Sequence, residues 1–216
     1  MHAVNTHYNL DQLINTLAEQ GYVIVDNFFE TQHISALAAE ACQRWANGTL
    51  TSARTGNQAT SNLAVGNQTI RGDHIAWLDE SNKHPAINAY FAQIKQLQAA
   101  LNQHLFMNLH EIETHLALYP LGAGYQKHLD QFNHGHTAQP QARQLSTILY
   151  LNEHWQAEHG GALRLYVTED TYQDILPIGG RLVLFLSANF WHEVLPTKRE
   201  RISLTGWFRT RETQAI

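Results

Sequence analysis

The sequence is poor in charge, in cysteine and in long apolar runs, and each shortage excludes a class of protein. Only 15% of the 216 residues are charged, with 14 basic and 19 acidic side chains and a net charge of −5, and no basic block offers a surface to a nucleic-acid backbone. The single cysteine, Cys42, excludes an internal disulfide and a zinc site built from several thiolates of one chain. The longest notable apolar run, 182–186, is far shorter than the ~20 residues that span a bilayer.

The composition otherwise indicates an ordinary globular chain. Apolar residues make up 44% of the sequence, and the opening stretch MHAVNTHYNLDQL lacks the basic and apolar segments of an export signal. We therefore expect a cytoplasmic protein with neither a membrane nor a nucleic acid as partner. No linker or internal repeat divides the sequence, so we predict a single domain over 1–216. Histidine is plentiful, with 14 residues, and imidazole is the commonest metal ligand among side chains.

The first half of the sequence predicts three amphipathic helices, over 9–20, 32–46 and 86–106, where apolar residues recur at helical spacing. Asn9 is a suitable cap for the first helix and Gly21 ends it, before a strand over 22–25. Cys42 falls on the apolar stripe of the second helix, so we expect it in the core and not as a nucleophile. Residues 48–69 are rich in Gly, Asn, Thr and Ser and predict a mobile hairpin or loop.

From Glu111 onward the apolar pattern changes to that of strands. Turn signals such as Gly160-Gly161 separate eight short segments. This spacing favours an α+β fold in which a double-sheet jelly roll, or double-stranded β-helix, has the N-terminal helices packed on one outer face. The predicted strands are 112–119, 125–130, 145–151, 162–167, 174–178, 181–186, 191–195 and 201–209.

A histidine and a carboxylate stand two residues apart, as His128 and Asp130, in one predicted strand. Positions i and i+2 of a strand project to the same face, so both side chains are expected to enter the interior together. A second histidine, His192, lies among apolar residues, as suits an imidazole at the wall of a buried cavity. Two histidines and one carboxylate are the ligand set of non-haem Fe(II) oxygenases, which keeps coordination positions open for a co-substrate and O₂.

A rival ligand set adds His134 and His136 to His128 and Asp130. Asn133 and Gly135 favour a turn between them, so we interpret that stretch as a surface loop.

An arginine follows on the last strand, with Arg201, Ser203, Thr205 and Trp207 sharing one face of it. An arginine that faces the interior needs an anion, and its planar fork binds a carboxylate through two hydrogen bonds. The distal carboxylate of 2-oxoglutarate would supply this anion while its 2-oxo acid end chelates iron. The alternative is a surface strand on which Arg201 is merely solvated, in the company of Arg199.

The order and spacing of these residues resemble those of the 2-oxoglutarate- and Fe(II)-dependent dioxygenases. The sequence around them is similar to the prolyl 4-hydroxylase branch of that family, above all to the hypoxia-sensing EGLN-type enzymes. The resemblance extends over most of residues 70–209. Besides His128-x-Asp130, His192 and Arg201-x-Ser203, the segments that carry it are Ile70–Trp77, Leu118-Tyr119-Pro120, Gly124-Tyr125, Ile148–Asn152 with Trp155, Gly160–Arg164, His192-Glu193-Val194 and Trp207.

The resemblance implies an enzyme that hydroxylates C4 of a prolyl residue in a protein, converting 2-oxoglutarate and O₂ to succinate and CO₂. By position, His128, Asp130 and His192 would bind Fe(II), and Arg201 with Tyr150 would hold 2-oxoglutarate. Residues 1–109 would provide helical support and a substrate loop, and 110–210 the dioxygenase core. Ascorbate would re-reduce the iron, and a translation-machinery protein is the expected substrate. The pocket would be lined by Tyr119, Ile148, Leu163, Thr205 and Trp207.

Two other readings are open. The same chemistry could act on a free amino acid or small metabolite, or the chain could be a non-catalytic metal-binding jelly-roll module. The sequence departs from the family at His115, where relatives carry an apolar or small residue. Arg71 and Asp73 could brace the base of the polar loop or reach the substrate, and the sequence does not choose between these roles.

Overall fold

Three helices precede most of the sheet in the computed structural model, which describes residues 8–53, 70–131 and 143–210. They are α1 (Leu10–Gln20), α2 (Thr31–Ala46) and α3 (Pro85–Leu105), each within one residue of its predicted bounds. The Asn9 side chain accepts a hydrogen bond from the Gln12 amide at 3.0 Å and so caps α1. Gly21, with φ of 75°, ends that helix in the left-handed conformation, as the sequence predicts.

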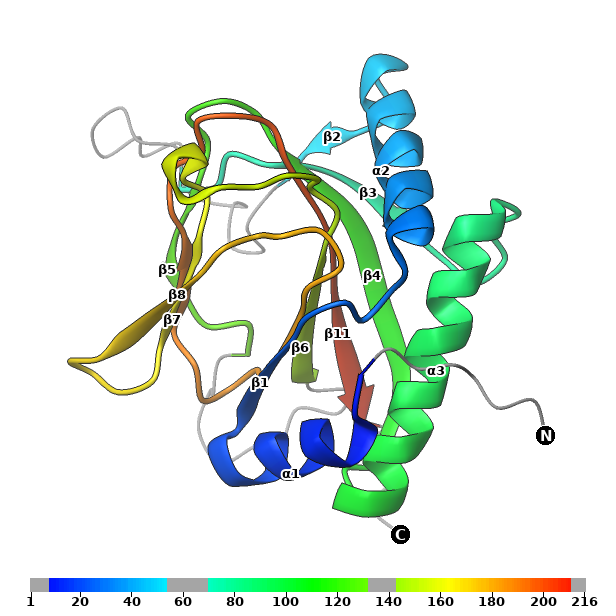
Figure 1. Ribbon diagram of the computed structural model, residues 1–216, viewed down its shortest axis with the longest axis vertical. Coiled ribbons are helices and arrows are strands. Elements are labelled where there is room, and N and C mark those ends of the chain that lie inside the picture. Colours follow the sequence, from blue (N-terminus) through cyan, green and yellow to red (C-terminus); the bar gives the residue numbers. More distant parts are fainter. Residues whose placement is uncertain (1–7, 54–69, 132–142, 211–216) are drawn as a thin grey trace, which may run out of the picture.

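Two antiparallel sheets form the rest of the fold (Figure 1). The major sheet has seven strands in the order β1-β9-β6-β11-β4-β3-β2, and the minor sheet has four in the order β5-β10-β7-β8. The strands are β1 (Tyr22–Val25), β2 (Thr51–Ser52), β3 (His74–Leu78), β4 (Leu109–Tyr119), β5 (Tyr125–His128), β6 (Arg143–Tyr150), β7 (Leu163–Tyr166), β8 (Tyr172–Ile175), β9 (Leu182–Leu186), β10 (His192–Val194) and β11 (Arg201–Thr210). The predicted jelly roll is confirmed.

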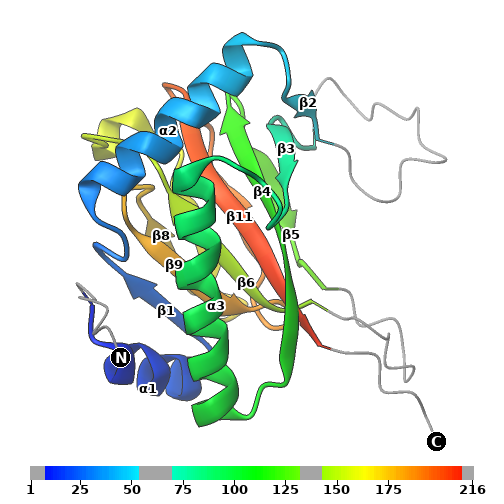
Figure 2. The same ribbon diagram turned by 90° about the vertical axis from the view of Figure 1, so that its right-hand side faces the viewer.

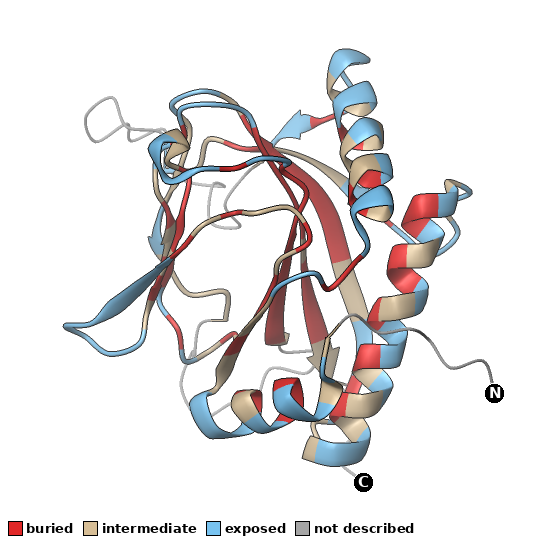
Figure 3. Ribbon diagram, in the orientation of Figure 1, coloured by how far each residue is buried: buried red, intermediate tan, exposed pale blue. Residues whose placement is uncertain are grey.

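The helices cover the outer face of the major sheet, with α3 running along β4 and β11 in Figure 2. Alternation along β11 sends Leu204 and Phe208 into this helix-side core, where both are fully buried. The opposite face of the major sheet meets the minor sheet in a second apolar cluster, which includes Ile148, Leu163 and Phe185. In Figure 3 the buried stretches of β4, β6 and β11 lie between the helices and the minor sheet. A site between the sheets is therefore held by side chains on alternate positions of long, buried strands.

Three local predictions need correction. Cys42 is exposed, because the buried stripe of α2 consists of Ile34, Leu37 and Ala41, and the next position already turns outward. Asp130 lies in a bend beyond the end of β5, so strand alternation alone does not orient it. Arg71 and Asp73, two residues apart on the approach to Trp77, are expected within one strand, but β3 begins only at His74, where it pairs with β2.

Most of the predicted loop 48–69 lies outside the described residues, as do His134 and His136. In the described part of the chain, no helix has both the length and the apolar character to cross a membrane. The division of the chain at residue 109 stays a prediction.

Candidate active site

A cavity of about 690 Å³ opens between the two sheets. It contains all three predicted iron ligands and Arg201, which come from both sheets. Such a concave space with a few converging polar groups is typical of a small-molecule site. Its lining is formed by Ile70, Arg71, Ile75, Trp77, His115, Tyr119, Tyr125, Gln126, Lys127, His128, Leu129, Asp130, Arg143, Ile148, Leu163, His192, Val194, Arg201, Thr205 and Trp207.

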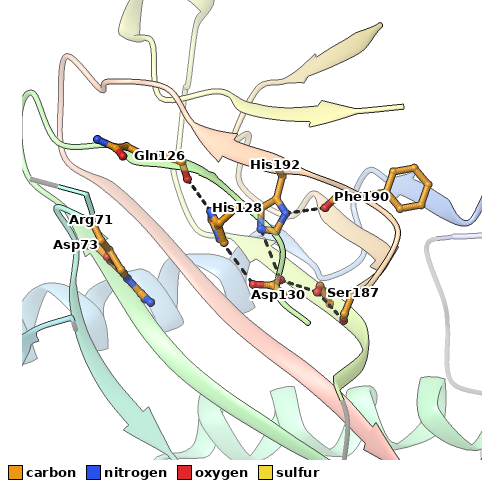
Figure 4. A network of polar contacts seen from close by, with 9 residues as sticks. Arg71, Asp73, Gln126, His128, Asp130, Ser187, Phe190 and His192 are labelled. Atoms are coloured by element: carbon orange, nitrogen blue, oxygen red, sulfur yellow. Dashed lines mark hydrogen bonds and ion pairs between the residues drawn. The ribbon is translucent and has the colours of Figure 1, made fainter. Parts of the chain in front are cut away.

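His128, Asp130 and His192 converge at one end of this cavity (Figure 4). Strands β5 and β10 pair antiparallel with His128 opposite His192, which brings the two rings to a centroid distance of 4.2 Å. Asp130 Oδ1 lies 3.7 Å from His128 Nε2, and Oδ2 lies 3.6 Å from His192 Nε2. One ligating atom of each residue lies within 4.8 Å of the others, so the three can share one cation.

Each histidine is oriented by a backbone carbonyl. His128 Nδ1 donates to the Gln126 carbonyl at 2.7 Å, and His192 Nδ1 donates to the Phe190 carbonyl at 3.1 Å. A carbonyl only accepts, so the proton sits on Nδ1 and the lone pair of Nε2 faces Asp130 in both rings. This hydrogen-bonded arrangement of imidazoles is the one found around protein-bound metals.

The electrostatics keep His128 and Asp130 in their metal-binding forms. Burial and the neighbouring His192 lower the pKa of His128 to about 4, so the ring is neutral near pH 7. Burial alone would raise the pKa of Asp130, but His192, His128 and a hydrogen bond from Ser146 hold it below its ordinary value. A neutral imidazole therefore lies beside an ionised carboxylate.

Arg201 lies at the first residue of β11 and is 1% exposed, which rules out the solvated surface strand. Its Nε donates to the Gly161 carbonyl at 2.9 Å. Gly161 has φ of +65°, and a Cβ there would lie 3.2 Å from Arg201 Cδ, so the glycine allows this approach. Among the described residues, no carboxylate forms an ion pair with Arg201. A buried cation without a partner is costly, so the arrangement calls for an anion from outside the chain.

Two tyrosines surround the Arg201 guanidinium, with ring centroids 4.9 Å away at Tyr119 and 5.0 Å at Tyr150. The Tyr150 hydroxyl is buried with no hydrogen-bond partner in the described structure. Burial is the main reason that its pKa is raised, so the phenol keeps its proton and can donate. The predicted pocket residues Tyr119, Ile148, Leu163, Thr205 and Trp207 all line the cavity, whereas Tyr150 contacts Arg201 without being one of the lining residues.

Some residues of the cavity escaped the sequence reasoning. Tyr125 stacks on the His128 ring at 3.6 Å, and Arg143 lies 3.6 Å above the Trp207 ring. Strand alternation does not predict Tyr125 beside the metal ligands, because it lies three residues before His128 and so has the opposite parity along β5. Arg143 could not be predicted either, because its place depends on the register between β6 and β11. Ser146, whose hydroxyl donates to Asp130 at 2.6 Å, left no signal in the sequence.

The two residues left open by the sequence form a brace. Arg71 donates to both oxygens of Asp73, at 2.6 and 2.9 Å, and the Asp73 side chain is fully buried. Arg71 also lies 4.9 Å from the centre of the Tyr125 ring and lines the cavity, on the side away from His192 in Figure 4. The pair therefore anchors the segment before β3 against β5.

His115 faces the cavity from β4, opposite Thr205 on β11 and Trp77 on β3. It is 1% exposed, and its Nδ1 has no hydrogen-bond partner in the described part of the chain. Burial, with the nearby positive charge of Arg71, lowers the pKa of His115 to about 3. The cavity therefore contains a third imidazole, neutral and apart from the other two.

The sequence of this chain is similar to those of known proteins. A profile of the 2OG-Fe(II) oxygenase superfamily matches residues 114–209. Mouse prolyl hydroxylase EGLN3 is 30% identical over 213 residues, which cover 95% of this chain and 85% of the mouse protein. The hypoxia-inducible factor prolyl hydroxylase of Caenorhabditis elegans is 32% identical over 210 residues, 93% of this chain and 28% of the nematode protein.

Solved structures agree with the sequence relatives. A Pseudomonas putida prolyl-4-hydroxylase superposes with a TM-score of 0.81 at 41% identity, covering 94% of this chain and all of the Pseudomonas chain. A Trichoplax adhaerens prolyl hydroxylase, solved with a hypoxia inducible factor peptide fragment, gives a TM-score of 0.80 at 26% identity, with coverage of 93% and 88%.

The fold, the His-Asp-His set and these matches define the class of protein as a 2-oxoglutarate- and Fe(II)-dependent dioxygenase. Within that class, the chain belongs to the prolyl hydroxylase family, whose members match it over nearly its whole length. The predicted resemblance is thereby confirmed.

Proposed function

We propose that this enzyme hydroxylates C4 of a prolyl residue in a protein substrate. The observation that carries the proposal is the presence, in one cavity, of a His-Asp-His set at one end and, at the other, a buried arginine that has no carboxylate partner among the described residues. Fe(II) bound at the first would, with O₂ and 2-oxoglutarate, replace a C–H bond by C–OH and release succinate and CO₂. A non-catalytic metal-binding module would need the metal ligands but not the buried arginine.

The proposed iron ligands are His128, Asp130 and His192. Neutral imidazole nitrogens and a carboxylate suit Fe(II), and three ligands on one side leave positions open for a chelating co-substrate and O₂. The carbonyls of Gln126 and Phe190 hold the rings in the required tautomer before any metal arrives. The unit of Fe(II) and Asp130 carries one net positive charge, which favours an anionic co-substrate.

The proposed 2-oxoglutarate anchor is Arg201 with Tyr150. The guanidinium has no carboxylate partner in the described structure, and the Tyr150 hydroxyl has no partner at all there, so a carboxylate between them would satisfy both. Tyr119 places its ring against the same guanidinium. Ile148, Leu163, Thr205 and Trp207 would flank the rest of the co-substrate and exclude water from it.

A protein substrate is favoured over a small metabolite by the cavity mouth. Two large apolar side chains that line the cavity, Trp77 and Ile70, are 56% and 49% exposed. Exposed apolar residues at the rim of a pocket are typical of a surface that binds a polypeptide. The names of the relatives point the same way, since the Trichoplax enzyme was solved with a peptide fragment.

The proposal has three finer parts. They are a substrate from the translation machinery, a cytoplasmic location and the use of ascorbate to re-reduce iron after turnovers that produce no hydroxyproline. Omitting ascorbate should shorten the period of linear turnover without changing its initial rate.

The test combines succinate release with mass spectrometry. Proteins of the host cell are incubated with the enzyme, Fe(II) and 2-oxoglutarate, and their peptides are searched for prolyl residues that gained one oxygen atom. We expect such peptides only when all three components are present, together with faster succinate release. Stimulation by a small metabolite, with no modified protein, would favour the second reading of the sequence.

A further inference from the structure

We infer that Ser146 is a positioning residue for Asp130, and that Ser187 acts through it. The inference rests on the proposed role of Asp130 as an iron ligand. Asp130 is the one proposed ligand outside a strand, because it lies in a bend after the end of β5. His128 and His192, in contrast, face each other in a paired register. Some other feature must fix the carboxylate.

The hydroxyl of Ser146 supplies that feature. Ser146 lies on β6, is 1% exposed, and donates from Oγ to Asp130 Oδ2 at 2.6 Å. A hydrogen bond to a carboxylate is about twice as strong as a neutral one, and a buried hydroxyl in a paired strand has little freedom to leave it. The strand itself is held by its pairing with both β9 and β11. Asp130 is thus tied to the centre of the major sheet.

The Ser187 hydroxyl donates a hydrogen bond to Ser146 and so leaves the Ser146 proton for Asp130. The hydroxyls of Ser146 and Ser187 lie 2.9 Å apart, and Ser187 is fully buried. A hydroxyl has one proton, and that of Ser146 is used toward Asp130, so Ser187 must be the donor between the two serines. The result is a directed chain from Ser187 to Ser146 to the carboxylate.

The backbone of Ser187 also forms hydrogen bonds that hold the bend containing Asp130. Its amide donates to the Gln144 carbonyl of β6 at 3.0 Å, and its carbonyl accepts from the Gln131 amide at 3.3 Å. The residue after Asp130 is therefore anchored to the residue that directs Ser146. Figure 4 shows Asp130 and Ser187 on the same side of the two histidines.

The inference predicts how Mn²⁺, a stable substitute for Fe(II), binds to the purified protein. Partners of metal ligands typically contribute 10- to 100-fold to metal affinity, so Ser146→Ala should weaken Mn²⁺ binding by about that factor. Ser146→Thr keeps the hydroxyl and should restore most of the affinity. Ser187→Ala should have a smaller effect, because Ser146 can still donate to Asp130.

A double variant tests the chain itself. If Ser187 acts on the carboxylate only through Ser146, the double variant Ser146→Ala/Ser187→Ala should bind Mn²⁺ as weakly as Ser146→Ala alone. Ser203→Ala is the matched control, since Ser203 is a buried serine on the neighbouring strand β11 that contacts Thr205 and no proposed ligand. It should bind Mn²⁺ like the wild type.

The experiment is a Mn²⁺ titration followed by electron paramagnetic resonance, with a melting curve of each metal-free variant. Wild-type affinity in Ser146→Ala, no rescue by Thr, or equal losses in the Ser146 and Ser203 variants would overturn the inference, and additive losses in the double variant would overturn the chain. Asp130→Ala in the same titration separates this inference from the proposed function. If Asp130→Ala binds Mn²⁺ normally, the ligand assignment itself is wrong.

Discussion

The two sheets contribute to the cavity in different ways. Strands β4 and β11 of the major sheet have 11 and 10 residues and are covered by helices, whereas β5 and β10 of the minor sheet have four and three, and each has one end at the site. The major sheet delivers Arg201 and Tyr150 from the ends of its long strands β11 and β6, and the minor sheet delivers His128 and His192 from the paired short strands β5 and β10. Asp130, in contrast, lies in a bend. We conclude that strand register places the co-substrate end and the two histidines, whereas hydrogen bonds from another strand place the carboxylate of the metal end.

The largest effect is expected at the metal end. His192→Ala removes one of three ligands and should weaken Mn²⁺ binding by more than about 100-fold, abolishing turnover, because the remaining two side chains no longer close one face around the ion. The affinity of this variant for 2-oxoglutarate in the absence of metal should not increase. A Mn²⁺ titration measures this.

The controls are other histidines. His104→Ala, on the exposed side of α3, should bind Mn²⁺ normally, as should His134→Ala and His136→Ala. Normal binding by His192→Ala with a loss in His136→Ala would replace the ligand set proposed above.

At the other end, Arg201→Ala should raise the KM for 2-oxoglutarate roughly 30- to 1000-fold and leave Mn²⁺ affinity nearly unchanged. Loss of a charge-assisted pair of hydrogen bonds costs on the order of 2–4 kcal/mol. Arg201→Lys should recover part of this loss, because an ammonium replaces the planar fork by a point charge.

Arg199→Ala is the matched control, since Arg199 precedes β11 and is exposed. Should Arg199→Ala show the larger rise in KM, the co-substrate would be bound elsewhere. Equal losses of Mn²⁺ and 2-oxoglutarate affinity in Arg201→Ala would show that the two ends are not separable.

Tyr150→Phe sharpens the same comparison. The change removes the hydroxyl that has no partner in the described structure and keeps the ring against Arg201. A hydrogen bond to a charged group contributes about 1.5–3 kcal/mol, so we expect a rise in the KM for 2-oxoglutarate of roughly 10- to 100-fold. The melting temperature should stay the same or rise, since a buried unpaired hydroxyl is lost. A fall in melting temperature with unchanged KM would assign Tyr150 to folding alone.

His115 predicts a smaller, pH-dependent effect. Its pKa in the folded protein is about 3, below the ordinary 6.5, so between these values the unfolded chain binds more protons and stability rises with pH. Its contribution is complete above about pH 6.5 and is lost as the pH falls toward 3. At pH 5 the loss is about 2 kcal/mol relative to pH 7.

Unfolding by denaturant at pH 7 and pH 5 measures this dependence. His115→Met should lose less stability on acidification than the wild type, although His128 titrates in the same direction in both proteins. An identical loss in the two proteins would mean that His115 is charged or solvated in the fold.

The same contrast explains which features could be predicted from the sequence. The strict alternation of a strand predicts Arg201, Thr205 and Trp207 on one face, and the β11 pairings agree. Helix bounds followed from caps such as Asn9. Periodicity and local chemistry therefore sufficed for the helices and the central strand.

What could not be predicted depends on contacts between distant segments. The sequence predicts Asp130 on a strand, but it lies in a bend, and the serines that hold it come from β6 and from the residue after β9. The apolar pattern predicts Cys42 in the core, but the buried stripe of α2 is narrower than that pattern. Which distant side chain forms a hydrogen bond with a residue, and how wide a face of a helix is buried, both depend on tertiary contacts that the neighbouring sequence does not specify.

The central claim is that the metal end and the co-substrate end of the cavity act together in the hydroxylation of a prolyl residue. The most direct test uses a protein that gains oxygen in the experiment described above. It is incubated with the enzyme under isotopically heavy O₂, and both products are analysed by mass spectrometry. We predict one heavy oxygen atom in the prolyl residue and one in succinate, and neither in the His192→Ala enzyme. Heavy succinate with every prolyl residue unmodified, or heavy oxygen in neither product, would contradict the account.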